Sequence, residues 1–157
     1  MAEENQEQPA PESKGVNVQK IYLKDVSLEV PGAPLVFQNE WNPDADVQLG
    51  TASKKLGDGV FEVVLTVTVT TKLKDQTAFL VEVKQAGVFS MQGFGEQEYG
   101  PLLGSFCPGV LFPYAREAIS DLVGKAGFPQ LLLQPVNFDA LYAQHVQQQA
   151  QAAEKAH

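Results

Sequence analysis

The sequence has few of the residues that enzymes and metalloproteins use in their active sites. Its 157 residues include a single cysteine, Cys107, and two histidines, His145 and His157. One cysteine cannot form an internal disulfide bond, which is typical of proteins from a reducing compartment. Because cysteine pairs and a histidine cluster are both missing, we expect no catalytic residues, no metal ion and no other cofactor. Cys107 and His145 are expected to be packed side chains instead of a nucleophile and a base.

Long apolar runs and an excess of positive charge are also missing. No stretch approaches the roughly 20 apolar residues that span a bilayer, so no direct membrane insertion is expected. The start of the chain, MAEENQEQPAPESKG, is acidic and polar, where a secretory signal would be basic and then apolar. The formal net charge of -8 repels nucleic acid and anionic lipid and attracts basic partners. These features predict a cytoplasmic protein that does not bind nucleic acid.

Two glycine-containing stretches resemble nucleotide-binding motifs without completing them. In GFGEQE, Glu98 stands where the dinucleotide fingerprint requires its third glycine. In GKAG, residues 124–127, both the preceding glycine loop and the serine or threonine of a phosphate-binding loop are missing. Neither stretch therefore predicts a nucleotide site.

Alternating apolar and polar residues give the clearest structural signal, over residues 60–73. On one parity the residues are mostly Phe, Val or Leu, and on the other they are mostly Thr and Glu. This period of two predicts a strand with one buried face. After the turn KDQ, the run 77–90 shows the same alternation around Val81 and Glu82. The two runs predict a long antiparallel hairpin.

Two further strands are predicted before this hairpin. Residues 16–30 alternate as well, but the parity of their apolar residues slips between Leu23 and Val26, which indicates a β-bulge. The prolines at 31–34 end this strand, and a loop leads to another strand over 47–55. The expected sheet therefore has four antiparallel strands.

Two amphipathic helices are predicted after the strands. Residues 110–123 carry apolar side chains along one stripe, with Pro113 near the start and Gly124 and Gly127 as the stop signal. A second helix begins at Asn137, which is a good N-cap. The order of elements predicts an α+β fold, a four-stranded antiparallel sheet followed by two helices.

This core is flanked by two predicted tails. Residues 1–15 have the composition of a disordered acidic tail, and residues 147–157 that of a flexible C-terminal tail, which leaves one α+β domain over 16–146. A single sheet with two helices leaves faces and edges to cover, so assembly through the helix at 110–123 is one expectation. In the alternative, that helix covers only its own sheet.

Several segments, spread over residues 18–149, match one known family. The most specific are CPGVLFPYAREAI and FPQLLLQPVNFDALY, and IYLKDVSLEVPGAP and TAFLVEVKQAGVFS match as well. Together they resemble the SecB family of bacterial protein-export chaperones. The tails and QGFGEQEYGPLLG depart from the family pattern, and Val81 stands where some members carry a cysteine. The resemblance implies that residues 16–146 form a SecB-like α+β domain, which assembles as a homotetramer, a dimer of dimers.

The resemblance also implies a function. A SecB-like protein is an ATP-independent export chaperone, which binds unfolded precursor proteins in apolar grooves, keeps them translocation-competent and delivers them to the motor protein SecA. Two alternatives are a SecB-like chaperone of a toxin-antitoxin pair and a small apolar-ligand binding module. An enzyme that uses carboxylates and His145 ranks last, because no residue spacing supports it.

Three sets of residues correspond to functional positions of the family. The acidic set engages the zinc-bearing C-terminal tail of SecA in the family, and strand alternation places its members on one face; it comprises Asp25, Glu29, Leu80 and Glu82. The substrate-binding candidates are Trp41, Val47, Leu49, Phe128, Leu131 and Leu133. The oligomer-interface candidates are Tyr114, Ala118, Ile119 and Leu122. In the alternative, the apolar members are ordinary core and the acidic set is a solvated sheet face.

Overall fold

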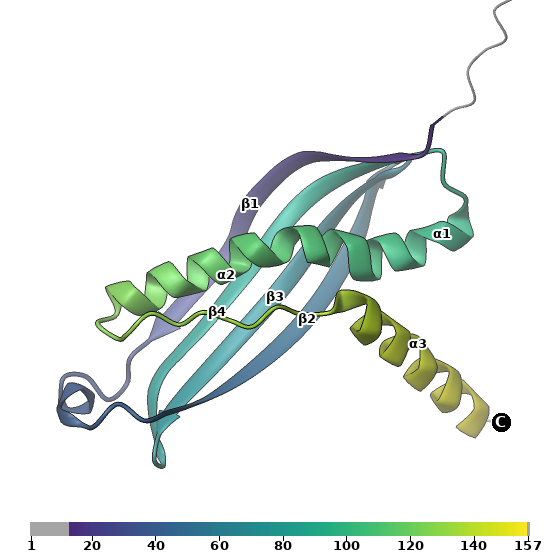
Figure 1. The fold of residues 1–157 in the computed structure, drawn as a ribbon. Helices are drawn as coiled ribbons and strands as arrows, with labels where there is room; N and C mark the ends of the chain where they lie inside the picture. Colours follow the sequence, from purple (N-terminus) through teal and green to yellow (C-terminus); the bar gives the residue numbers. More distant parts are fainter. Residues whose placement is uncertain (1–12, 157) are drawn as a thin grey trace, which may run out of the picture.

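The computed structural model describes residues 13–156 and shows a twisted antiparallel sheet with helices on one side (Figure 1). The strands are β1 (Gly15–Glu29), β2 (Pro43–Gly57), β3 (Val60–Leu73) and β4 (Gln76–Gln92), in the order β1-β4-β3-β2. A short 3-10 turn, η1 (Leu35–Gln38), lies in the connection from β1 to β2. The predicted α+β class and the four antiparallel strands are confirmed. Of the predicted acidic tail 1–15, residues 1–12 lie outside the described residues.

The predicted hairpin provides the two central strands, and one of its faces is the core. The fully buried side chains on this face include Val63, Leu65, Val67 and Val69 in β3 and Val81, Val83 and Phe89 in β4. Because successive side chains in a strand point to opposite faces, the residues between them form the other side of the sheet, where threonines and charged residues are half-buried. We call the first side the covered face and the second side the open face.

Strand β1 has the predicted irregularity and also a second register shift, between Val18 and Lys20, that was not predicted. Its register against β4 shifts between Leu23 and Asp25, which confirms the bulge. Beyond the shift, Leu28 lies opposite Val81 on the covered face. A slip of one residue exchanges the two faces of a strand, so the bulge returns the apolar side chains of β1 to the core side.

The helical part of the chain begins earlier than predicted. After β4, α1 (Glu96–Pro101), a π-helical turn η2 (Leu102–Phe106) and α2 (Cys107–Lys125) follow one another without a break. The apolar stripe predicts only residues 110–123, so α1 and η2 are additional elements. Because α2 begins at Cys107, Pro113 lies inside the helix, and the prediction that it stands near the start is wrong.

Helix α2 lies across the covered face (Figure 1). The side chains that it buries against β3 and β4 recur every four residues and are Leu111, Ala115, Ile119 and Val123. One stripe of the predicted helix is therefore used to cover its own sheet.

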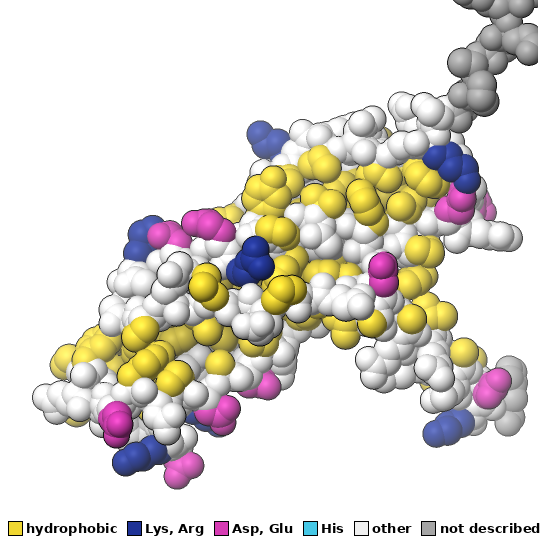
Figure 2. All heavy atoms as spheres, viewed as in Figure 1, with side chains coloured by type: hydrophobic (Ala, Val, Ile, Leu, Met, Phe, Trp, Pro, Cys, Tyr) yellow, Lys and Arg dark blue, Asp and Glu magenta, His cyan; other side chains and the backbone are white. Residues whose placement is uncertain are grey.

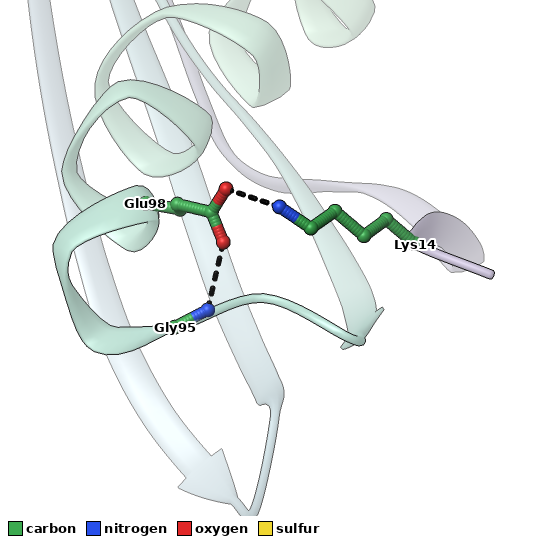
Figure 3. Close-up of polar contacts among 3 residues, drawn as sticks. All are labelled: Lys14, Gly95 and Glu98. Carbon is green, nitrogen blue, oxygen red and sulfur yellow. Dashed lines mark hydrogen bonds and ion pairs between the residues drawn. The ribbon is translucent and has the colours of Figure 1, made fainter. Parts of the chain in front are cut away.

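Glu98 explains how a helix starts within a glycine-containing stretch (Figure 3). Its carboxylate accepts a hydrogen bond from the backbone N–H of Gly95 at 2.8 Å and pairs with Lys14 Nζ at 2.6 Å. An acidic side chain at this position satisfies an N–H group that the start of a helix leaves without a partner. Lys14 and this backbone hydrogen bond lower the pKa of Glu98. The glutamate that breaks the dinucleotide fingerprint thus has a structural role.

Helix α3 (Phe138–Lys155) is the second predicted helix. The Oδ1 atom of Asn137 accepts a hydrogen bond from the backbone N–H of Ala140 at 3.0 Å, which confirms the predicted cap. α3 points away from the sheet in Figure 1. Phe138 is buried, whereas every side chain over 143–156 is exposed. The helix continues to Lys155, so most of the predicted tail 147–157 is helical.

Candidate functional site

A groove runs along the edge strand β2 on the covered face. It consists of two neighbouring hollows, of about 540 Å³ and about 790 Å³, and Val47, Leu49 and Leu141 line both of them. The wall opposite β2 is formed in the first hollow by residues 133–137, Phe112 of α2 and the start of α3, and in the second by α1, η2 and α3. Because the hollows share their lining, they form one continuous groove.

Several apolar side chains of this groove are accessible to solvent. Val47 and Leu141 are each 42% exposed, and Leu49 is half-buried. Leu133, which lines the first hollow, is 7% exposed. Covering such side chains removes apolar surface from water, which stabilises a complex by roughly 25 cal/mol per Å². The groove therefore favours partners that bring apolar side chains.

An aromatic cluster around Phe128 adds a second apolar surface. The ring centroid of Phe128 lies 5.2 Å from that of Phe37, 5.5 Å from that of Trp41 and 5.1 Å from that of Phe79. Phe128 and Phe79 are buried, whereas Phe37 is 48% exposed and Trp41 is 37% exposed. The outer rings of the cluster thus offer aromatic contact to a partner.

The structure brings most of the substrate-binding candidates together in two places. Val47, Leu49 and Leu133 line the first hollow, and Trp41 and Phe128 belong to the aromatic cluster. Leu131 is in neither place, because it is partly buried and packs against the core.

Two exposed apolar residues of these surfaces are additions to the predicted set. Phe37 lies in η1, where no periodic pattern singles it out. Leu141 lies on the apolar side of the second predicted helix. The sequence offered one signal for Leu141, because it is an apolar side chain on a helix for which no packing partner was predicted.

The four residues predicted to engage SecA lie together on the open face. Glu29 lies opposite Leu80, and Asp25 and Glu82 follow on the same face of β1 and β4. Thr68 Oγ1 in β3 donates a hydrogen bond to Glu82 Oε1 at 2.9 Å, which orients this carboxylate. The register thus places the three carboxylates along one face, with Leu80 at one end and Lys84 opposite Asp25, and we call this surface the acidic patch.

A second polar cluster lies further along the open face. Glu62 in β3 accepts a hydrogen bond from the Tyr22 hydroxyl and pairs with Lys24 Nζ at 2.7 Å. The hydrogen bonds from Lys24 and Tyr22 lower the pKa of Glu62. The hydrogen bond to Glu62, together with burial, raises the pKa of Tyr22 to about 12. These contacts join β1 to β3 across β4.

The outer side of α2 carries apolar side chains that the chain itself does not cover. Tyr114 is 51% exposed, and Ala118 and Leu122 are half-buried. Figure 2 shows hydrophobic side chains gathered over this side of the molecule, with few charged side chains among them. Ile119, by contrast, is 0% exposed and packs against the sheet. The prediction that Ile119 belongs to the oligomer interface is therefore wrong. The helix has two apolar stripes, and Ile119 lies on the inner one.

The chemistry of the remaining candidates is limited. Burial raises the pKa of the Cys107 thiol to about 12, so the reactive thiolate is scarcely populated at neutral pH. His145 is exposed and lines the second hollow, so the prediction that it packs in the interior is wrong. Within residues 13–156, no group of three or more His, Cys, Asp and Glu side chains could hold a metal ion. None of the helices in the described part of the chain is long and apolar enough to cross a bilayer.

The chain is an α+β domain with an accessible apolar groove, and sequence similarity identifies its family. A family profile described as "Preprotein translocase subunit SecB" matches residues 6–149. The chain is 56% identical over 156 residues to "Protein-export protein SecB" from Methylococcus capsulatus, covering 99% of this chain and 98% of that protein. It is 57% identical over 144 residues to the protein of the same description from Nitrosococcus oceani, covering 89% and 88%. The chain belongs to the SecB family.

Its function is that of a chaperone in protein export and translocation. Among solved structures, the fold matches a SecB-like chaperone from Mycobacterium tuberculosis in complex with a ChAD peptide from the HigA1 antitoxin. The TM-score is 0.67 at 20% sequence identity, with 77% of this chain and 90% of that chain covered. This likeness shows the fold.

Proposed function

We propose that the groove along β2 binds unfolded precursor proteins, keeps them translocation-competent without ATP and hands them to SecA. The main support is the accessibility of its apolar lining, with Val47 and Leu141 each 42% exposed. An unfolded polypeptide presents its apolar side chains, whereas a folded one buries them. The groove therefore selects unfolded chains without recognising a particular sequence.

Binding of this kind requires several contacts at once. One buried Leu or Phe contributes roughly 1.5 to 3 kcal/mol, whereas association costs roughly 4 to 15 kcal/mol. The two hollows and the aromatic cluster offer several anchoring points to one client chain. After the first anchor has bound, the others bind at high effective concentration, so the sum exceeds the cost of association. Such a holding reaction needs no nucleotide.

A homotetramer extends the same surface over four subunits. Tyr114, Ala118 and Leu122 on the outer side of α2 are the residues through which two dimers contact each other in this proposal. Their apolar surface is the kind that oligomers bury. The interface set thus retains three of its four predicted members and excludes Ile119.

The acidic patch is the proposed docking surface for the zinc-bearing tail of SecA. Its support is the register, in which Asp25, Glu29 and Glu82 share one face with Leu80. An apolar side chain beside carboxylates suits a basic partner that also carries apolar groups. Client and SecA then use opposite faces of the same sheet, so both can be bound at once.

Two neighbouring residues of β2 provide a test of the client site. Val47 faces the groove, and Gln48 lies on the open face opposite Thr68. We expect Val47→Asp to weaken binding of a slow-folding precursor on the order of tenfold, because a charge enters an apolar surface. Gln48→Asp adds the same charge one residue away and is expected to leave binding unchanged.

The measurement is the fluorescence anisotropy of the labelled precursor, added unfolded and, in a parallel titration, already folded. Equal affinity for the two forms, or equal affinity of the two variants for the unfolded form, would exclude the groove as the client site. An apolar-ligand module, the alternative, would instead bind a small ligand that solvent extraction releases. The accessible lining of the groove is less suited to enclosing such a ligand.

A further inference from the structure

Helix α3 is the wall of the groove with the least support from the core. Its Leu141 and Gln144 line both hollows, yet the side chains over 143–156 are all exposed. The position of α3 therefore depends on the contacts of its first turns.

Two glycines accommodate the Tyr142 side chain of α3. A methyl group placed on Gly104 would lie 2.4 Å from Tyr142 Cδ2 and 2.7 Å from Cε2. A methyl group placed on Gly100 would lie 2.5 Å from the Tyr142 hydroxyl oxygen. Residues four apart lie on one side of a helical run, so the two glycines form a single notch that contains Tyr142. We call it the glycine notch.

The other contacts of α3 lie at its start. The Ser105 hydroxyl donates a hydrogen bond to the Asp139 carboxylate, and the rings of Phe112 and Phe138 lie 5.8 Å apart. They fix the first turn of the helix. Tyr142 follows one turn later, so its contact with the glycine notch sets the direction in which the helix continues.

We propose that the glycine notch positions α3 by accommodating Tyr142, and that it thereby sets the width of the client-binding groove. Gly100, Gly104 and Tyr142 themselves line the second hollow, so the contact that holds the wall also shapes the surface. The three are positioning residues. The proposal rests on the proposed function of the groove and adds the residues that determine its dimensions.

The two glycines give different expectations for the same tyrosine. At Gly100 an added methyl group meets the hydroxyl, and the nearest ring carbon is 3.7 Å away, so Tyr142→Phe removes the clash. At Gly104 the added methyl group meets ring carbons, so Tyr142→Phe leaves the clash in place. Gly100→Ala also places an alanine before Pro101, which strains the helical backbone there. This strain is the same with and without Tyr142→Phe, so it cancels when the two Gly100→Ala proteins are compared.

The experiment measures binding of reduced, carboxymethylated ribonuclease, a chain that cannot refold, by fluorescence anisotropy. Gly100→Ala and Gly104→Ala are each expected to weaken binding on the order of tenfold. Adding Tyr142→Phe restores Gly100→Ala to within about twofold of Tyr142→Phe alone, and it does not restore Gly104→Ala. The control is Gly109→Ala, where the added methyl group has its nearest neighbour, Phe138 Cδ2, at 4.0 Å and no effect is expected.

Amide hydrogen exchange over residues 139–145 reports the position of α3 without any client. We expect faster exchange in both glycine variants and protection restored only in the combination of Gly100→Ala with Tyr142→Phe. If exchange changes and affinity does not, or if Tyr142→Phe restores both glycine variants equally, the positioning role is overturned. Should Gly104→Ala fail to fold, the Gly100→Ala pair decides alone. Val47→Asp tests the groove itself, so parental affinity in that variant overturns the proposed function separately.

Discussion

The two faces of the sheet differ in what holds their side chains in place. Val67 and Thr68 are neighbours in β3, yet Val67 is 0% exposed on the covered face, whereas Thr68 is half-buried on the open face. Val67 is held by packing against other apolar side chains of the core. Thr68 is held by a single hydrogen bond, to Glu82. One strand thus serves two purposes, because alternate residues have different neighbours.

The covered face combines stability with client recognition, whereas the open face carries charges. The covered face supplies the core, and where the core reaches the edge at β2 it becomes the accessible apolar groove. The open face contributes less to the core, so its charges are available for a partner. We therefore expect substitutions in the buried part of the covered face to change the free energy of unfolding, those in the groove to change client binding, and those on the open face to change SecA binding.

The largest expected effect compares two neighbouring residues of β3. Leu65 is 0% exposed, so Leu65→Ala is expected to lower the free energy of unfolding by roughly 2 to 5 kcal/mol through lost burial and a cavity. Thr66→Ala, on the open face, is expected to change it by less than about 0.5 kcal/mol. Urea unfolding followed by circular dichroism measures both. Similar losses for the two variants would contradict the difference between the faces.

The second prediction concerns the acidic patch. Reversing one charge with Glu82→Lys is expected to weaken SecA binding on the order of tenfold at low salt, with a smaller effect at high salt. Asp58→Lys, in the turn between β2 and β3, makes the same change in net charge away from the patch. Calorimetric titration with SecA distinguishes the two variants. Equal weakening by both would mean that net charge, and not the patch, determines the affinity.

A smaller effect is expected from a hydroxyl on the covered face. Thr71 is 1% exposed, and its Oγ1 atom has no hydrogen-bond partner among the described residues. Thr71→Val replaces it with an apolar group of the same shape, so stability is expected to stay constant or to rise by about 1 kcal/mol. Thr68→Val, which removes the hydrogen bond to Glu82, is expected to lower it slightly. A clear loss of stability in Thr71→Val would show that its hydroxyl has a partner after all.

The smallest effect is the titration of a single group on the open face. Because Glu62 accepts its hydrogen bond, Tyr22 has a pKa raised to about 12. Because the pKa of Tyr22 is raised in the folded state, the hydrogen bond from Tyr22 stabilises the fold fully below about pH 10, the ordinary pKa of tyrosine. This contribution is lost as the pH rises through about 12. In Glu62→Gln the Tyr22 pKa is expected to fall back toward its ordinary value, as followed by the NMR signals of its ring. An unchanged Tyr22 pKa in Glu62→Gln would contradict the assignment of its shift to this hydrogen bond.

The sequence predicted the sheet well because its signals are local. Alternation defined β3 and β4, and the slip in parity between Leu23 and Val26 located the bulge. The same pattern placed the acidic patch on one face. These features depend only on the strand period of two, which each strand carries in its own residues.

The helical region was predicted less well because its signals are not local. Gly100, Pro101 and Gly104 suggest a loop, yet the two glycines lie in a helical run and accommodate Tyr142, about forty residues further on. Periodicity likewise gave α2 a single stripe, so it could not separate the buried Ile119 from the exposed Tyr114. The groove residues came from family resemblance, because no single segment shows that β2 and α3 face each other.

A methyl NMR titration with an unfolded client tests most directly whether clients bind on the covered side of the sheet. The covered side offers the methyl groups of Val47, Leu49, Leu133 and Leu141, and the open face offers those of Val64, Leu80 and Val88. We expect shifts confined to the first set, because the client lies in the groove. Shifts confined to the second set would place the client on the open face and contradict the division of the sheet into a client side and a docking side.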